Sequence, residues 1–233
     1  KHLYTIRIIS TISILVSYMN SYLVWNKKII SNLSDETINR AYAGGFLFTR
    51  EGKGKMYQTR SVRIDLEKFE LSSENRRILR KITNFKFQIS NLPMVDYDWK
   101  IGKMAKDFYT VKFGEGIFSA NKVKELLTTD HNFNKLLVYN DSVGYCICRE
   151  TNELLHYSYP FYILHSTFPN LGLGMMLRAI IYAQETGKKY VYLGSAKDAK
   201  AKYKLQFDGL EWFDGEKWEN NIEKLKNILK SSI

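Results

Sequence analysis

Hydrophobic and polar positions recur with different periods along the chain, and the pattern predicts both helices and strands. Near the N-terminus, Ser34 followed by two acidic residues predicts the start of a helix that ends before Gly44. Segments 46–49 and 56–64 indicate two strands, joined in a hairpin by the basic, glycine-rich turn between them. A second helix is predicted to begin at Ser72, with cations on one side and apolar residues on the other.

The second half of the chain has the signals of a sheet with helices packed on it. A helix is predicted at 120–128. Three strands with alternating apolar residues are expected to form an antiparallel meander: 135–140, 143–149 and 154–164. A glycine loop, a helix, a buried strand, a hairpin on an Asp-Gly turn and a terminal helix follow. The fold class predicted is α+β, a mixed sheet flanked by helices.

Pro93 and the polar, aromatic residues after it suggest a boundary within 91–100. We therefore expect a basic N-terminal subdomain at 1–95 and a second domain at 96–233. The longest apolar run, 6–18, is shorter than the ~20 residues that cross a bilayer, so it is interpreted as buried strand. With only two cysteines, Cys146 and Cys148, a cytoplasmic protein without a structural disulfide or metal site is expected.

The charge balance favours an anionic partner. Thirty-five Lys and Arg against 24 Asp and Glu give a formal net charge of +11. Nucleic acid, a membrane surface or an acidic peptide would each fit this surplus, and so would a basic surface that only keeps the protein soluble.

The order of meander, glycine loop, helix and strand resembles the GNAT acyltransferase superfamily. In that superfamily the loop, here Gly172 to Gly174, binds the pyrophosphate of coenzyme A through backbone amides. The resemblance implies a GNAT-like fold and, as one alternative, an acetyl-coenzyme A-dependent N-acetyltransferase. Pro169 departs from the pattern, because a basic residue or Gln usually stands three positions before the first glycine.

Several other motifs resemble the arginyl-tRNA–protein transferase family, in the family's order. Residues 190–194 (Tyr-Val-Tyr-Leu-Gly) and 200–204 (Lys-Ala-Lys-Tyr-Lys) are similar to its Tyr-Leu-Gly strand and its Lys-Met-x-Tyr-Lys segment. Residues 171–174 are similar to its Leu-Ser-Leu-Gly. Towards the N-terminus, residues 63–65 with Phe69, and residues 73–81, resemble its Arg-Ile and Ser-x-x-Arg-Arg elements.

The resemblance implies an enzyme that joins a basic or aliphatic amino acid (Arg or Leu-like), carried by tRNA, to the N-terminal amine of a protein that begins with Asp or Glu; the bacterial branch transfers leucine. Aminoacyl-tRNA would be the co-substrate, with no further cofactor and no membrane partner. Residues in the matched motifs then become candidate tRNA contacts: Arg76, Arg77, Arg80, Lys81, Gly172, Gly174, Gly194, Ser195, Lys200, Lys202 and Lys204. The alternative for each charged cluster is a solvated face.

Departures from the family leave the acceptor open. Asn20 and Ser21 stand where the family carries a cysteine, and residues 43–46 read Ala-Gly-Gly-Phe in place of its Gly-x-Arg-Arg element. A tRNA-binding or protein-binding descendant without activity is therefore a third alternative.

The chemistry of aminoacyl transfer needs a neutral amine and a stabilised oxyanion. The resemblance and the residue types suggest backbone amides around 193–195 for the oxyanion, and Tyr203 or Tyr192 as hydrogen-bond donors. His165 would relay a proton, although a capping or surface histidine is the simpler interpretation.

Overall fold

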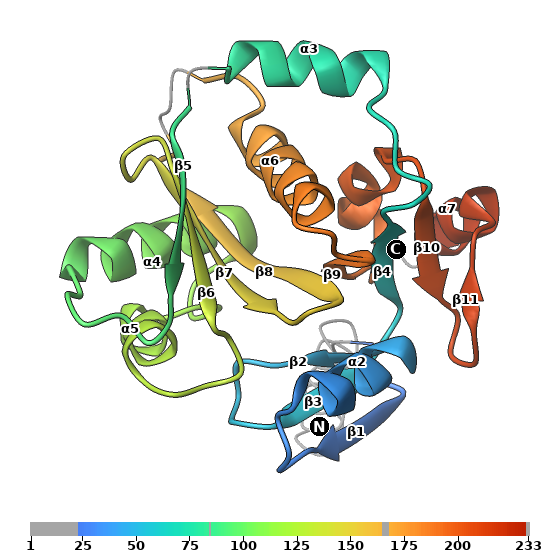
Figure 1. Cartoon of the computed structure of the whole chain (residues 1–233), viewed down its shortest axis with the longest axis horizontal. Coiled ribbons are helices and arrows are strands. Elements are labelled where there is room, and N and C mark those ends of the chain that lie inside the picture. The colour runs from blue at the N-terminus through green and yellow to red at the C-terminus, as the bar shows by residue number, and fades with distance from the viewer. Residues whose placement is uncertain (1–22, 84, 165–167, 232–233) are drawn as a thin grey trace, which may run out of the picture.

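The computed structural model describes residues 23–83, 85–164 and 168–231, and it is an α+β protein built on an eight-stranded mixed sheet (Figure 1). The strand order is β11-β10-β4-β9-β8-β7-β6-β5. In chain order these strands are β4 (Ser61–Asp65), β5 (Phe87–Asn91), β6 (Lys135–Tyr139), β7 (Gly144–Glu150), β8 (Leu154–Tyr162), β9 (Tyr190–Ser195), β10 (Leu210–Phe213) and β11 (Trp218–Glu219).

The predicted meander is confirmed, since β6, β7 and β8 pair antiparallel in sequence order. β8 and β9 are parallel, and α6 (Leu171–Glu185) is the crossover between them. The other pairs in this sheet are antiparallel.

A smaller sheet of β1 (Asn26–Ile29), β3 (Lys55–Gln58) and β2 (Phe46–Phe48) lies beside the main one. Its helix, α2 (Asp35–Ala43), begins after the Ser34 cap and ends at Gly44, as predicted. The prediction of one strand at 56–64 is wrong. The chain breaks at Thr59, whose carbonyl accepts from the Ser61 amide, and the two halves enter different sheets as β3 and β4.

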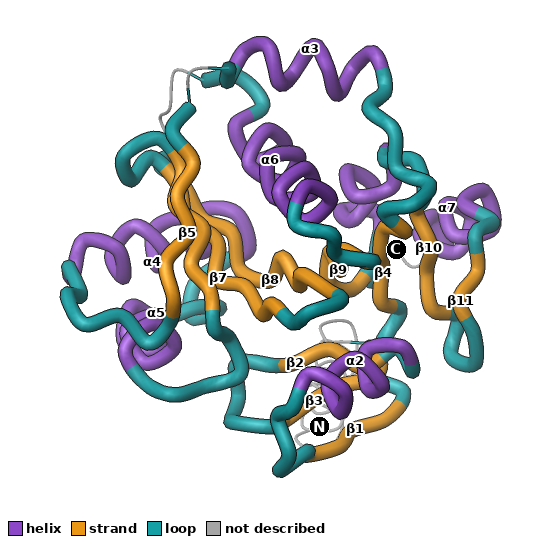
Figure 2. The backbone as a smooth tube through the Cα atoms, viewed as in Figure 1, coloured by secondary structure: helices purple, strands orange, loops and turns teal. Residues whose placement is uncertain are grey.

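Helices cover both faces of the main sheet and enclose two cores (Figure 2). α6, α3 (Ser73–Lys81) and α7 (Ile222–Ser231) pack on one face. α4 (Trp99–Phe113), α5 (Ala120–Thr128) and α2 pack on the other. α3 begins at its predicted cap, Ser72, and α5 has the predicted bounds and is capped by Ser119. The sequence pattern gave no indication of α4.

Two strands that precede residue 95 belong to the main sheet: β4 pairs with β9 and β10, and β5 pairs with β6. A domain boundary at 95 stays a prediction. Within the described ranges, no helix has the length and apolarity needed to span a bilayer. The apolar run at 6–18 lies outside those ranges.

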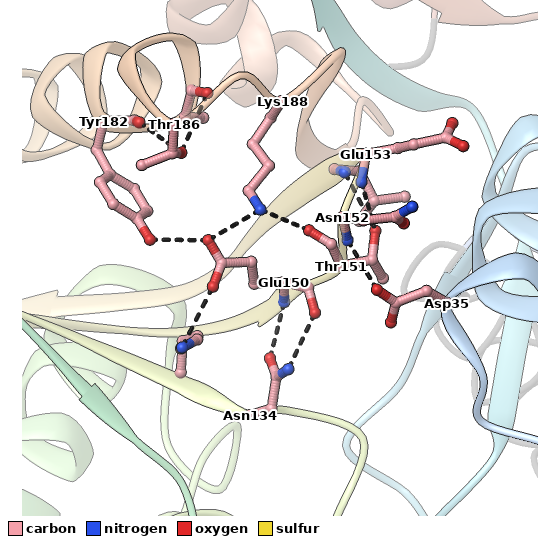
Figure 3. A network of polar contacts seen from close by, with 12 residues as sticks. Asp35, Asn134, Glu150, Thr151, Asn152, Glu153, Tyr182, Thr186 and Lys188 are labelled. Carbon is pink, nitrogen blue, oxygen red and sulfur yellow. Dashed lines mark hydrogen bonds and ion pairs between the residues drawn. The ribbon is translucent and has the colours of Figure 1, made fainter.

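A polar network centred on Glu150 fixes the start of the parallel β8–β9 pair (Figure 3). The Glu150 carboxylate accepts from the Tyr182 hydroxyl at 2.8 Å and lies 3.5 Å from Lys188 Nζ and 3.4 Å from Lys135 Nζ. Lys188 Nζ also donates to the Thr151 carbonyl at 2.7 Å. The network therefore joins β6, the β7–β8 turn and the end of α6.

We expect Glu150→Gln to lower the free energy of unfolding by about 2–4 kcal/mol, because it leaves two partly buried lysines without a carboxylate. Asp141→Asn is the matched control, since Asp141 forms an exposed pair with Lys86 and should change stability by about 0–1 kcal/mol. Urea denaturation of both variants measures the difference. Equal effects would contradict the role given to Glu150.

Candidate active site where two parallel strands separate

The candidate site lies where β8 and β9 stop pairing. The parallel ladder has three pairs and ends at His156 opposite Tyr192. Past this point, β9 carries a bulge against β4, and Gly194 there has a φ of 83°. A positive φ strains residues with a side chain, so a glycine suits the position where β9 leaves its neighbour. A parallel pair that separates in mid-sheet exposes backbone between two strands.

Lys204 reaches into this opening. It belongs to the 3-10 helix η1 (Ala199–Gln206), whose Asp198 cap returns the chain towards β9. Lys204 Nζ donates to the Ser195 carbonyl at 2.8 Å, and a Cβ on Gly194 would lie 3.5 Å from the same nitrogen. Burial lowers the pKa of Lys204 to about 8, against a smaller opposing effect of the Asp198 carboxylate. A lysine with this pKa exchanges protons near neutral pH, which an exposed lysine does not.

One tyrosine stands beside Lys204, and a second interacts with the first. Tyr203 precedes it in η1 and is half exposed, with 50% of its surface accessible. Burial of the hydroxyl, and a smaller effect of Tyr162, raise the pKa of Tyr203, while burial also raises the pKa of Tyr162. Both phenols therefore stay protonated and can donate hydrogen bonds.

His156 marks the point of separation on β8, and sequence reasoning missed it. Its Nδ1 lies 2.9 Å from the hydroxyl of Tyr42, and the ring is buried. Burial, and secondarily the charge of Lys204, lower the pKa of His156 to about 3, so the ring is neutral. The one signal in the sequence was a histidine within a strand of otherwise apolar and aromatic residues.

A cluster around Arg63 holds the other side of β9. The Arg63 guanidinium lies between the rings of Tyr190 and Trp218, 3.8 Å and 3.9 Å from their centroids. Arg63 Nε donates to Glu211 at 2.8 Å, and Nη1 donates to the Tyr192 hydroxyl at 3.3 Å. Tyr192 is therefore buried within this cluster, and burial raises its pKa to about 12 against the opposing charge of Arg63.

The other predicted site residues are dispersed. Gly172 and Gly174 lie inside the first turn of α6, so the prediction of a loop there is wrong. A Cβ on Gly172 would lie 2.9 Å from the Tyr162 hydroxyl, and one on Gly174 would lie 2.8 Å from Ile82. Both glycines thus permit close packing of α6. His165 lies outside the described residues.

The predicted cationic contacts are mostly at the surface. Four exposed cations follow one another along α3: Arg76, Arg77, Arg80 and Lys81. Arg77 pairs with Glu74, and Arg76 donates to the Leu71 carbonyl. Lys200 and Lys202 are exposed on η1, in contrast to Lys204. Gly194 and Ser195, the predicted contacts on β9, lie against Lys204.

The folded pKa of Lys204 predicts a change of stability with pH. Its pKa is about 8 in the folded chain and 10.5 when unfolded, so between these values the unfolded chain binds more protons. Stability contributed at this position therefore rises with pH across that window. We expect the wild type to gain about 1–3 kcal/mol relative to Lys204→Met between pH 7.5 and 10.5. Urea denaturation at both pH values measures it, and a constant difference would mean that Lys204 is solvated.

A comparison with known proteins finds a relative of low sequence identity. No family model matches the sequence. The chain is 26% identical over 171 residues to an aspartate/glutamate leucyltransferase of Chromohalobacter salexigens, covering 70% of this chain and 68% of that protein. This similarity supports an enzyme of the aminoacyltransferase type in general.

Solved structures are similar only at low TM-scores. The C-terminal domain (DUF2156) of a putative lysylphosphatidylglycerol synthetase from Agrobacterium fabrum gives a TM-score of 0.42 at 14% identity, covering 70% of this chain and 52% of that one. The L-PGS of Bacillus licheniformis gives a TM-score of 0.44 at 11% identity, covering 83% of this chain and 70% of that one. FemX gives 0.42 at 9% identity, with coverages of 82% and 67%. This chain thus spans about half of the Agrobacterium chain.

Proposed function

We propose that the protein transfers an aminoacyl group from aminoacyl-tRNA to the N-terminal amine of a peptide or protein, on a GNAT-like fold. The observation that carries the proposal is Lys204, held against the Ser195 carbonyl where β8 and β9 separate, with a pKa of about 8. The sequence similarity to a leucyltransferase supports the same class of reaction.

The reaction requires one proton to move from the amine to the leaving oxygen. The amine nitrogen attacks the ester carbonyl, a C–N bond forms, and the C–O bond to the tRNA ribose breaks. In its neutral form Lys204 accepts the proton released by the amine, and as the ammonium it returns that proton to the leaving 3′ or 2′ oxygen. One group with a pKa near the working pH can carry out both steps.

The oxyanion of the tetrahedral intermediate needs hydrogen-bond donors. Tyr203 is a protonated phenol beside Lys204 with half of its surface exposed, and we assign it this role. Tyr192 is engaged by Arg63 and is assigned the support of β9 instead. The cations of α3 and the exposed lysines of η1 are assigned to tRNA phosphates.

The relative's name suggests which substrates to test first: leucine as the transferred amino acid and acidic N-termini as acceptors. Peptides that begin with Asp, Glu or Ala are incubated with the protein and [14C]leucyl-tRNA, [14C]arginyl-tRNA or [14C]acetyl-coenzyme A. Label is expected at the peptide α-amine from an aminoacyl-tRNA. Label from acetyl-coenzyme A alone would make the protein an acetyltransferase, and tRNA binding with no transfer from any donor would make it a binding protein.

A further inference from the structure

A basic cavity with aromatic walls lies on the side of α4 that faces α5. The two helices lie on the face of the main sheet opposite α3 and α6 (Figure 1). It has a volume of about 600 Å³, and the α4 and α5 lysines that line it are Lys103, Lys106 and Lys124. Its largest apolar surfaces are the rings of Tyr97 and Trp99. Of the residues that the structure describes, no aliphatic side chain larger than Ala120 lines the cavity, which distinguishes it from an ordinary apolar groove.

The Trp99 ring is available for contact. It is 64% exposed at the first position of α4, whereas most large apolar side chains of the described chain are buried or partly buried. An exposed indole beside cations provides a flat surface on which a planar ring can stack.

Tyr97 is held in place at a cost to α4. Gly102 lies in the interior of this helix, where a glycine is about 1 kcal/mol less favourable than alanine. A Cβ at Gly102 would collide with the Tyr97 hydroxyl and would lie 3.2 Å from the Ala120 carbonyl. The glycine therefore lets Tyr97 fold across α4 towards α5, so that the second aromatic wall is fixed before any ligand arrives.

The charge of the cavity is positive. Lys103 pairs with Asp107 at 2.5 Å, and Asp107 is the one carboxylate among the described residues that line the cavity. Within the described ranges, Lys106 and Lys124 have no carboxylate partner; Lys124 Nζ lies 6.0 Å from the centre of the Tyr97 ring. Two cations are thus left for an anionic ligand, and the amide of Asn121 adds both a donor and an acceptor.

We propose that this cavity binds an unpaired nucleotide of single-stranded RNA, with the base stacked on Trp99 and the flanking phosphates on Lys106 and Lys124. The chemistry matches what single strands require, namely an aromatic face for the base and cations that follow the backbone. The inference rests on the proposed function only in naming RNA, since aminoacyl-tRNA has an unpaired end. The site is separate from Lys204 and from the cations of α3.

The stacking of a base on Trp99 is tested by measuring the affinity for a labelled hexaadenylate RNA by fluorescence anisotropy. Trp99→Leu removes the aromatic face and keeps apolar bulk, and we expect it to weaken binding about 10-fold or more. Trp99→Phe keeps an aromatic face, so its RNA affinity should fall clearly less than that of Trp99→Leu. Ile29→Leu, at another exposed apolar position, should bind like the wild type. Equal losses in Trp99→Leu and Trp99→Phe, or no loss in either, would overturn the proposal.

The contact of the flanking phosphates with Lys106 and Lys124 is tested by the salt dependence of binding to the same RNA. Lys106→Ala/Lys124→Ala should reduce the slope of log K against log salt by about 1.4, at about 0.7 for each phosphate that is no longer neutralised. Lys224→Ala/Lys230→Ala removes the same charge from α7 and should leave the slope unchanged. If the slope changed equally in both double variants, the effect would come from net charge alone, and the proposed phosphate contacts would be wrong.

Competition identifies the class of ligand. A duplex RNA of the same length should compete weakly, because its bases are not free to stack. Anionic phosphatidylglycerol vesicles that displace the RNA in a Trp99-dependent manner would make the surface a lipid contact and overturn the proposal. Since binding is read without any transfer, a protein that binds RNA through Trp99 and transfers nothing would refute the proposed function alone.

Discussion

Replacement of Lys204 by Met is expected to lower the single-turnover rate of aminoacyl transfer by about 100-fold to 10,000-fold, the range for loss of a general acid–base group. Met keeps most of the length and packing of the lysine stem, but it cannot donate to the Ser195 carbonyl or move a proton. The rate is measured with enzyme in excess over a limiting peptide and with saturating preformed aminoacyl-tRNA, so that tRNA affinity does not limit it.

Two further variants separate proton transfer from charge. Lys204→Arg keeps a cation that does not deprotonate in this range, so we expect it to remain as slow as Lys204→Met. Lys230→Met, on the exposed surface of α7, is the matched control and should keep the wild-type rate. If Lys204→Arg were as fast as the wild type, Lys204 would act through its charge alone.

The second large effect is expected at Arg63. Arg63→Met leaves the Glu211 carboxylate, itself only 16% exposed, without its main partner. Breaking a buried pair from one side costs about 3–5 kcal/mol of unfolding free energy, and removal of the cation from between the Tyr190 and Trp218 rings adds to it. Guanidinium denaturation measures the change, provided that the m-value stays constant.

The double variant Arg63→Met/Glu211→Leu distinguishes a stranded charge from weakened packing. Because both partners of the pair are then apolar, we expect it to regain at least half of the stability that Arg63→Met removes. Arg40→Met breaks an exposed pair with Glu36 and should cost about 0–1 kcal/mol. A cost at Arg63 no larger than that at Arg40 would show that the cluster does not stabilise the sheet.

The Arg63 cluster joins residues that are far apart in the sequence. Arg63 and Tyr190 belong to two of the motifs that carry the family resemblance, and in the fold they meet Glu211 and Trp218 in a single cluster across β4, β9, β10 and β11. The cluster holds β9, the strand that carries Gly194 and Ser195. Sequence spacing cannot indicate that these residues form one cluster, because Arg63 and Glu211 are 148 positions apart.

Local signals predicted the elements that local interactions define. Ser34 and Ser72 were predicted as caps and do cap α2 and α3, and alternation along the chain predicted the meander. α4 was missed, because Gly102 interrupts it and lysines are spread around its buried positions. The break between β3 and β4 was missed because residues 58–61 contain neither glycine nor proline to mark a turn.

The site was predicted less completely than the fold. Lysine burial is decided by tertiary structure, so sequence alone grouped Lys204 with the exposed Lys200 and Lys202. The contact between His156 and Tyr42 of α2 likewise depends on tertiary structure, because the two residues are 114 positions apart. Tyr203 was identified from a motif, and the structure adds its exposure and its proximity to Tyr162.

The most direct test of the central claim, that aminoacyl transfer takes place where β8 and β9 separate, is photo-crosslinking with an aminoacyl-adenosine analogue. The analogue carries an amide in place of the reactive ester and a diazirine on the aminoacyl group, and labelled peptides are identified by mass spectrometry. We expect labelling within 156–162 and 193–204, and competition by intact aminoacyl-tRNA. Labelling confined to other segments, or labelling that aminoacyl-tRNA does not reduce, would contradict the claim.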